Sequence, residues 1–133
     1  MTLVRLIYCS TPKGIGDADI ADILEKSRTN NALDGITGVL VYNGTHFLQC
    51  LEGGRLTVTR RFAAIAADPR HKDVELLQVT VIPERRFPGW TMAYVGHTDI
   101  DQDIVTSYSP GPFEPQNMPF PDAIVDMLWR LAQ

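Results

Sequence analysis

Residues 36–53 have the sequence ITGVLVYNGTHFLQCLEG, and this stretch decides the fold. Apolar and β-branched residues, which are typical of strands, fill both of its halves. Asn43-Gly44 lies between the halves and is the strongest short-range signal for a hairpin turn. The stretch therefore predicts two antiparallel strands joined by a tight turn.

The chain around this hairpin alternates between strand and helix patterns. We expect a strand over 3–9, a helix over 17–31 with Asp17 as its N-cap, a helix over 55–67 that stops at Asp68-Pro69, and strands over 74–83 and 90–96. The resulting order, β-α-β-β-α-β-β, contains the ferredoxin-like split βαβ unit with one extra strand. It predicts an α+β fold in which both helices cover one face of the sheet.

The composition changes beyond residue 97. Residues 109–121 contain five of the nine prolines and predict an extended, irregular segment. The last stretch, PDAIVDMLWRLAQ (121–133), has apolar residues at helical spacing and is too apolar to stand in water alone. We therefore expect C-terminal capping helices, the last of which docks on the open sheet face or on a second subunit.

The composition is that of a globular protein of 133 residues, with 44% hydrophobic and 21% charged residues. There is no apolar run near the ~18 residues of a membrane span and no secretory signal, and two cysteines are too few for a disulfide framework. These features predict a cytoplasmic protein. The formal charge of −4 falls mainly on residues 99–133, which argues against direct nucleic-acid binding. The Arg60-Arg61 and Arg85-Arg86 pairs are interpreted as solvent-exposed edges.

Several polar side chains occupy positions that should face the core. Tyr8 and Gln49 lie on the apolar faces of their strands, Ser27 and Asn31 continue the buried stripe of the first helix, and Asn30 lies on its border. A buried amide or hydroxyl without a partner costs ~1–3 kcal/mol, so these groups need each other or a ligand. Any one of them alone is an ordinary satisfied core residue. Together they predict a polar-edged pocket suited to a planar heterocycle with carbonyl and imide edges.

Other functions exist on the same fold. An acylphosphatase-like hydrolase needs an arginine in the loop after the first strand, but the loop STPKGIG (10–16) offers only Lys13 and glycines to hold a phosphate. An RNA-binding module needs an exposed aromatic pair on the central strands and a basic surface, and the sequence offers neither. The hydrolase is the main alternative.

Two segments resemble the BLUF family, the flavin-binding blue-light sensors: RTNNALDGITGVLVYNGTHFLQCLEG (28–53) and DPRHKDVELLQVTVIPERRFPGWTMAYV (68–95). The resemblance begins at the Tyr8 strand and covers about residues 2–96. It rests on a combination: a strand-one tyrosine, N-N before G-I-T-G-x-L, F-x-Q-x-L-E-G, D-x-R-H and R-F-x-x-W-x-M. Each of these motifs alone would be weak evidence for the family.

The resemblance implies a non-covalently bound flavin whose ring lies between the two helices. FAD is the usual flavin of the family, and FMN or riboflavin are the alternatives. Asn31 would hydrogen-bond the C4 carbonyl and the N3–H group of the ring. The other residues implied to bind the flavin are Ile23, Ser27, Asn30, Gln49, Arg70 and His71.

The resemblance also implies the photochemistry. Tyr8 would donate an electron and a proton to the excited ring, and Gln49 would bridge the phenol and the flavin, because its amide both donates and accepts. A rearranged Gln49 amide would strengthen a hydrogen bond to the C4 carbonyl and shift the absorption spectrum to the red. Met92 and Trp90, on one face of the fifth strand, would pass the change onward.

A sensor of this kind signals by conformation and is not an enzyme. Residues 1–97 would form the sensor domain, and residues 98–133 would form its helical, proline-rich capping extension. We expect the output to be a partner protein supplied in trans, a change in homo-oligomer association, or both. The acidic tail and the apolar last helix are the expected moving surface.

Overall fold

The computed structural model describes residues 1–118 and 120–133. Its elements are β1 (Leu3–Pro12), α1 (Asp17–Asp34), β2 (Thr37–Tyr42), β3 (Phe47–Gly54), α2 (Arg55–Ala67), β4 (His71–Val81), β5 (Ala93–Val95), α3 (Gln102–Thr106), a 3-10 turn (Pro115–Asn117) and α4 (Pro121–Leu131). The predicted α+β fold class and the β-α-β-β-α-β-β order are confirmed. Among the described residues, none of the helices is both long enough and apolar enough to span a membrane.

The five strands form one sheet in the order β4-β1-β3-β2-β5. β1 runs antiparallel to both β3 and β4, and β5 runs parallel to β2. β2 and β3 form the predicted hairpin, which pairs from Thr37↔Glu52 to Tyr42↔Phe47. In the β1–β3 pair Tyr8 lies directly opposite Gln49. Because opposed residues share a face of the sheet, the register alone brings these two polar side chains together.

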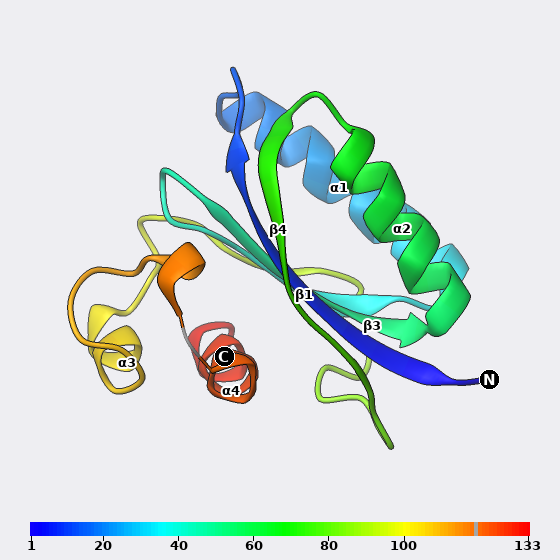
Figure 1. Ribbon diagram of the computed structural model, residues 1–133. Coiled ribbons are helices and arrows are strands. Elements are labelled where there is room, and N and C mark those ends of the chain that lie inside the picture. Colours follow the sequence, from blue (N-terminus) through cyan, green and yellow to red (C-terminus); the bar gives the residue numbers. More distant parts are fainter. Residues whose placement is uncertain (119) are drawn as a thin grey trace.

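Helices pack on both faces of the sheet (Figure 1). α1 and α2 cover one face, over an apolar cluster that includes Tyr8, Leu40 and Met92. α4 covers the other face, where its Ile124 and Met127 are fully buried. The last helix thus docks on the open face of the sheet, which is one of the two arrangements expected from its apolar sequence.

The beginning of α1 differs from the prediction. Asp17 is the first helical residue, and Gly16 takes the N-cap position instead. The Asp19 carboxylate reaches back and accepts a hydrogen bond from the Gly16 N–H at 2.9 Å, so the helix start is satisfied without a capping side chain at residue 17. The helix also continues beyond residue 31 to Asp34. It ends there because Gly35 adopts the left-handed conformation, with φ at 67°.

The fifth strand is shorter than predicted and covers only Ala93–Val95. The residues before it form a turn, in which the Trp90 N–H donates to the Phe87 carbonyl at 3.3 Å. The Trp90 carbonyl accepts from the Gly38 N–H at 2.7 Å. Trp90 and Met92 therefore precede the strand and do not follow its alternation of faces.

A buried carboxylate holds the segment between β4 and β5 against the sheet. Glu52 is 0% exposed, and its carboxylate pairs with Arg5 at 2.8 Å. The same carboxylate accepts the backbone N–H groups of Arg86 at 3.1 Å and Phe87 at 2.9 Å. Arg85 adds a hydrogen bond to the Glu52 carbonyl at 2.8 Å. The segment that leads to Met92 is thus anchored by charge-assisted hydrogen bonds, which are stronger than neutral ones.

We expect Glu52→Ala to lower the free energy of unfolding by about 3–5 kcal/mol, because it leaves Arg5 and two backbone N–H groups without their partner. Urea denaturation followed by circular dichroism measures the change. Glu25→Ala, at an exposed position of α1, is the matched control and should stay within about 0.5 kcal/mol of the wild type. A Glu52→Ala protein of wild-type stability would contradict the anchoring role of this carboxylate.

Candidate functional site

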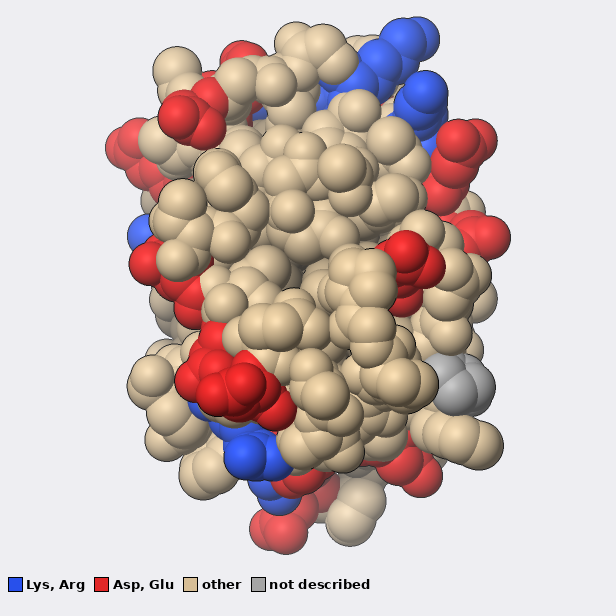
Figure 2. All heavy atoms as spheres, turned by 90° about the vertical axis from the view of Figure 1, so that its left-hand side faces the viewer, with Lys and Arg blue, Asp and Glu red and all other residues tan. Residues whose placement is uncertain are grey.

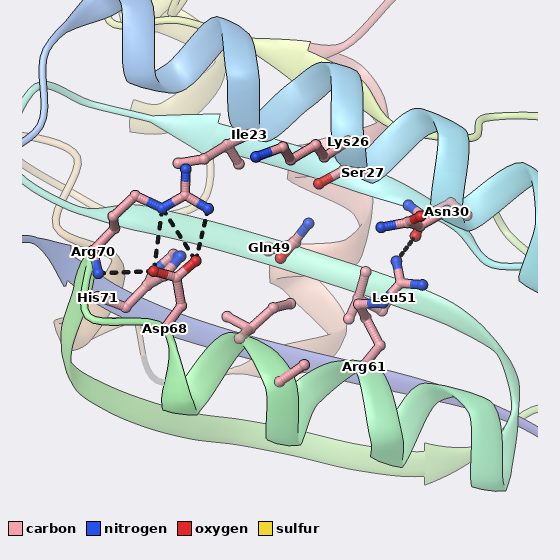
Figure 3. A pocket seen from close by; sticks show the side chains of 13 residues that line it. Ile23, Lys26, Ser27, Asn30, Gln49, Leu51, Arg61, Asp68, Arg70 and His71 are labelled. Atoms are coloured by element: carbon pink, nitrogen blue, oxygen red, sulfur yellow. Dashed lines mark hydrogen bonds and ion pairs between the residues drawn. The ribbon is translucent and has the colours of Figure 1, made fainter.

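A cleft lies between α1 and α2, with β3 as its floor (Figure 3). Its volume is about 200 Å³, and its lining residues are Ile23, Lys26, Ser27, Asn30, Asn31, Gln49, Leu51, Arg61, Ala64, Ile65, Asp68, Arg70 and His71. A smaller chamber of about 30 Å³ is lined by Tyr8, Leu40 and Phe47, among others. The residues that line both cavities are Ile23, Ser27, Gln49, Ile65 and His71. Because they share these walls, the two cavities are neighbouring parts of one site.

Tyr8 and Gln49 form a buried hydrogen-bonded pair beside the cleft. The Tyr8 hydroxyl donates to Gln49 Oε1, and Gln49 Nε2 lies 3.4 Å from Met92 Sδ. Tyr8 is 1% exposed and Gln49 is 4% exposed. Burial raises the pKa of the Tyr8 phenol well above its ordinary value, and the negative charge of Asp68 raises it further. The phenol therefore keeps its proton at neutral pH and presents it to the amide.

Asn31 lines the cleft with both ends of its amide hydrogen-bonded. It lies near the end of α1 and is 1% exposed. Its Nδ2 donates to the Thr91 carbonyl at 2.7 Å, which fixes the orientation of the amide, and its Oδ1 accepts from Arg61. Arg61 also pairs with Asp34 at 2.6 Å. Asn30 is exposed on the rim of the cleft. This end of the cleft therefore offers amide and guanidinium groups to a polar ligand edge.

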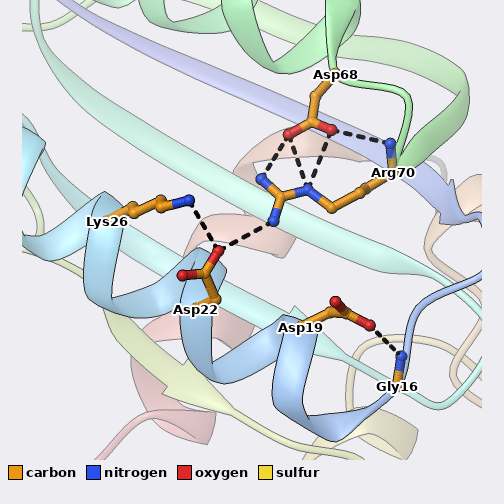
Figure 4. Close-up of polar contacts among 6 residues, drawn as sticks. All are labelled: Gly16, Asp19, Asp22, Lys26, Asp68 and Arg70. Atoms are coloured by element: carbon orange, nitrogen blue, oxygen red, sulfur yellow. Dashed lines mark hydrogen bonds and ion pairs between the residues drawn. The ribbon is translucent and has the colours of Figure 1, made fainter.

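Arg70 bridges the two helices at the opposite end of the cleft (Figures 3 and 4). Its guanidinium pairs with Asp68, at the end of α2, at 2.8 Å, and with Asp22 of α1 at 3.4 Å. Asp22 also pairs with Lys26 at 3.0 Å. The hydrogen bonds from Arg70 hold the pKa of Asp68 below its usual range. Both carboxylates are therefore charged at neutral pH and keep Arg70 and Lys26 at the mouth of the cleft.

His71 stands between the cleft and the inner chamber. Ser10 Oγ lies 2.8 Å from His71 Nδ1. Burial lowers the pKa of the imidazole, Asp68 opposes this effect, and Arg70 adds to it. The net shift is downward, so His71 is neutral at pH 7.

All the residues expected to bind the flavin line one cleft: Ile23, Ser27, Asn30, Asn31, Gln49, Arg70 and His71. Trp90 is different. It stacks on Phe87 at 5.4 Å in the cluster under α4, on the opposite face of the sheet from Met92. The expectation that Trp90 and Met92 share one face of a strand is therefore wrong, because the strand begins only at Ala93.

Sequence reasoning missed two charged residues of the cleft, Arg61 and Asp68. The interpretation of Arg61 as part of a solvent-exposed edge is wrong, since its side chain is only 17% exposed and reaches Asn31. The spacing along the helix could have indicated that Arg61 is partly buried. Arg61 follows the buried Val58 by three residues and so borders the buried face of α2. Asp68 was interpreted only as the end of the helix.

The side chains of the cleft fit a flavin. A flavin ring has two apolar faces and a pyrimidine edge on which carbonyl and N–H groups alternate. Ile23, Leu51 and Ile65 supply apolar walls, and Asn31 and Gln49 supply amides that can both donate and accept. The chemistry of this donor set matches such an edge better than it matches a phosphate or a metal ion.

Comparison with known proteins agrees with this site. Residues 3–93 match the model of the BLUF family, described as sensors of blue light using FAD. The photo-activated structure of BlsA is 33% identical with a TM-score of 0.86, and the dark-state structure of BlrB is 35% identical with a TM-score of 0.81; each comparison covers 98% of this chain and 94% of the other. These comparisons give no support to the hydrolase alternative.

Curated relatives match this chain over a small part of their own length. The photoactivated adenylate cyclase subunit beta of Euglena longa is 31% identical over 111 residues, which is 82% of this chain and 12% of that protein. The blue light- and temperature-regulated antirepressor BluF of Escherichia coli K12 is 37% identical over 68 residues, 51% of this chain and 17% of that protein. The chain thus spans less than a fifth of the length of these relatives. From its fold, its cleft and these matches, the chain belongs to the BLUF family of flavin-binding blue-light sensors.

Proposed function

We propose that Tyr8 and Gln49 are the residues that respond to light, with Tyr8 as the electron and proton donor. The observation that carries this proposal is the buried hydrogen bond from the Tyr8 hydroxyl to Gln49 Oε1 beside the cleft. When bound, the flavin supplies the absorption of blue light and an excited ring that accepts an electron and a proton. The remaining steps belong to the protein side chains.

Tyr8 holds its proton until light arrives. Its raised pKa keeps the phenol neutral, and its hydroxyl is directed at Gln49 Oε1. Once Tyr8 loses an electron, its phenol becomes a much stronger acid, and Gln49 is the first acceptor on the path of the departing proton. The electron and the proton would then return to Tyr8, so that the rearranged Gln49 amide is the only lasting change.

Gln49 is the residue that changes state. Rotation or tautomerisation of its amide reverses which end donates and which accepts. Its Nε2 then leaves Met92 Sδ, a weak acceptor whose contact costs little to break, and a donor turns toward the flavin. We propose that the resulting hydrogen bond to the C4 carbonyl produces the red shift and that Met92 is the first residue to sense it.

We expect Gln49→Leu to bind flavin and to lose the reversible red shift, because leucine cannot bridge the phenol and the flavin. Absorption spectra in the dark, after blue light and during dark recovery measure this. Gln133→Leu, at the exposed end of the chain, should keep the full shift. A reversible red shift in Gln49→Leu would refute the proposed role of the amide.

We propose FAD as the flavin, in line with the description of the family. Asn31, which lines the cleft, would hold the pyrimidine edge, and Asn30 would lie beside it on the rim. The residues placed against the ring and the ribityl chain are Ile23, Ser27, Arg70 and His71. Lys26 is 66% exposed at the mouth of the cleft and suits the phosphates of FAD.

We expect the apoprotein to bind FAD more tightly than FMN and riboflavin, because phosphates meet Lys26 and Arg70 at the mouth. Calorimetric titration with each flavin measures the order. Lys26→Gln should weaken FAD binding by roughly fivefold, the loss of one charge-assisted contact, and leave riboflavin binding unchanged. Lys13→Gln, on the exposed loop after β1, is the control. Equal affinities for FAD and riboflavin would contradict the assignment of FAD.

We propose that the signal leaves through residues 82–92, which join β4 to β5. At one end of this segment, the Thr91 carbonyl accepts from Asn31, and Met92 contacts Gln49. Near its other end, Arg86 pairs with Asp126 of α4 at 3.1 Å. The Arg86 guanidinium also lies over the Trp129 ring, 4.9 Å from its centroid. The segment therefore touches both the flavin cleft and the last helix.

The face that carries α3 and α4 would be the output surface. Figure 2 shows this face as a broad area with few charged side chains, bordered mostly by acidic ones, with basic side chains at its upper and lower ends. Such a surface suits a partner protein or a second copy of the chain. In this proposal residues 1–97 form the sensor and residues 98–133 form the capping extension that responds. A cytoplasmic location stays a prediction from the composition.

We expect Arg86→Gln to keep the flavin red shift but to reduce the light-induced change at α4, because it removes the ion pair and the contact with Trp129. Hydrogen–deuterium exchange of residues 121–131 in the dark and under blue light measures that change. Arg60→Gln, at an exposed position of α2, is the matched control. An unchanged light-induced difference in Arg86→Gln would exclude this route.

A further inference from the structure

Ser10 makes a buried contact that the relay described above does not use. It follows Tyr8 by two residues on β1 and therefore faces the same side of the sheet. Ser10 is 1% exposed, and its Oγ lies 2.8 Å from Nδ1 of His71, the first residue of β4. No other hydrogen bond of this hydroxyl is found among the described residues. The serine side chain is thus committed to one nitrogen of the imidazole.

The direction of this hydrogen bond follows from the count of donors. A neutral imidazole carries its proton on one nitrogen only. If Nδ1 carried it, the ring would donate to Ser10, and the hydroxyl hydrogen of Ser10 would be buried with no acceptor among the described residues. If Nε2 carries it, Ser10 donates to the Nδ1 lone pair, and the donor left without a partner is the Nε2–H of a ring that lines two cavities. The second arrangement is favoured, because water or a ligand in those cavities can accept from Nε2–H, whereas the Ser10 hydroxyl hydrogen would be buried without an acceptor.

Packing keeps the ring in one place. The imidazole lies 5.2 Å from the Phe47 ring and 6.4 Å from the Tyr8 ring, centroid to centroid. The charged groups near it are Asp68 and Arg70, and their effects on the imidazole oppose each other. Nε2 makes no hydrogen bond within the part of the chain that the structure describes, although His71 lines both the cleft and the inner chamber. Its N–H group is therefore available to a ligand.

We propose that Ser10 is a positioning residue that holds His71 as the Nε2–H tautomer, so that His71 offers a hydrogen-bond donor to an acceptor atom of the flavin. This inference rests on the proposed flavin cleft. In this chain, the Ser10 hydroxyl would determine which nitrogen of His71 carries the proton and donates to the cofactor. Ser10 itself does not touch the flavin in this arrangement.

The tautomer can be observed directly by ¹⁵N NMR of the histidine side chains in the dark, flavin-loaded protein. The chain has only three histidines, so His71→Gln assigns the His71 signals by their loss. We expect an unprotonated Nδ1 and a protonated Nε2 in the wild type and in Ser10→Thr, which keeps the hydroxyl. Ser10→Cys, which has nearly the same shape but is a weak donor, should show a mixture of tautomers. Its flavin dissociation constant should rise by roughly fivefold, the loss of one well-placed hydrogen bond.

Two results would overturn the proposal: a wild-type His71 protonated on Nδ1, or the same single tautomer in Ser10→Cys and Ser10→Ala. The wild-type measurement decides the first point even if a variant fails to fold. Failure of the proposed function gives a different result. If the wild type bound no flavin, the cleft assignment would fall, while the apoprotein spectrum would still show whether Ser10 selects the tautomer of His71.

Discussion

The hydrogen bond between Tyr8 and Gln49 is the interaction on which the rest of the site depends. It joins β1 and β3, and the register of these strands sets the two side chains opposite each other under α1 and α2. Burial gives the bond its direction, because the phenol keeps its proton and the amide oxygen is the acceptor it meets. An amide has two unlike ends, so one change of orientation reverses both of its contacts. A two-state element of this kind is what a light sensor needs.

A change in the Gln49 amide can affect the rest of the protein only if the residues in contact with it are held in a fixed position. Glu52 and Arg85 fix the start of the segment between β4 and β5, and Met92 at its other end contacts Gln49. In the proposed function this anchoring directs a change at Met92 toward α4, because a tightly packed segment moves as a unit. In that proposal the same buried carboxylate serves both the stability of the fold and the transmission of the signal.

Much of the fold and of the site was predictable, because it follows from periodicity. Strand alternation places Tyr8 and Gln49 on apolar faces, and helical spacing places Ser27 and Asn31 on the buried side of α1. A short connection that contains Asn43-Gly44 makes the β2–β3 hairpin. The BLUF resemblance rests on these same positions, and the family match confirms it. Prediction failed where periodicity ends: Trp90 and Met92 lie in a turn, so their spacing says nothing about a shared face.

The sequence by itself determined the order of the elements, the polar residues among apolar ones and the family, since these depend on local patterns and short motifs. Only the tertiary structure decided that Arg61 reaches Asn31, that Ser10 contacts His71, and that α4 takes the open face of the sheet, one of the two arrangements its apolar sequence left open. The physical reason is the same in each case. These contacts join residues that are far apart in the chain through side chains whose direction is set by packing, and no local pattern encodes where such a partner will be.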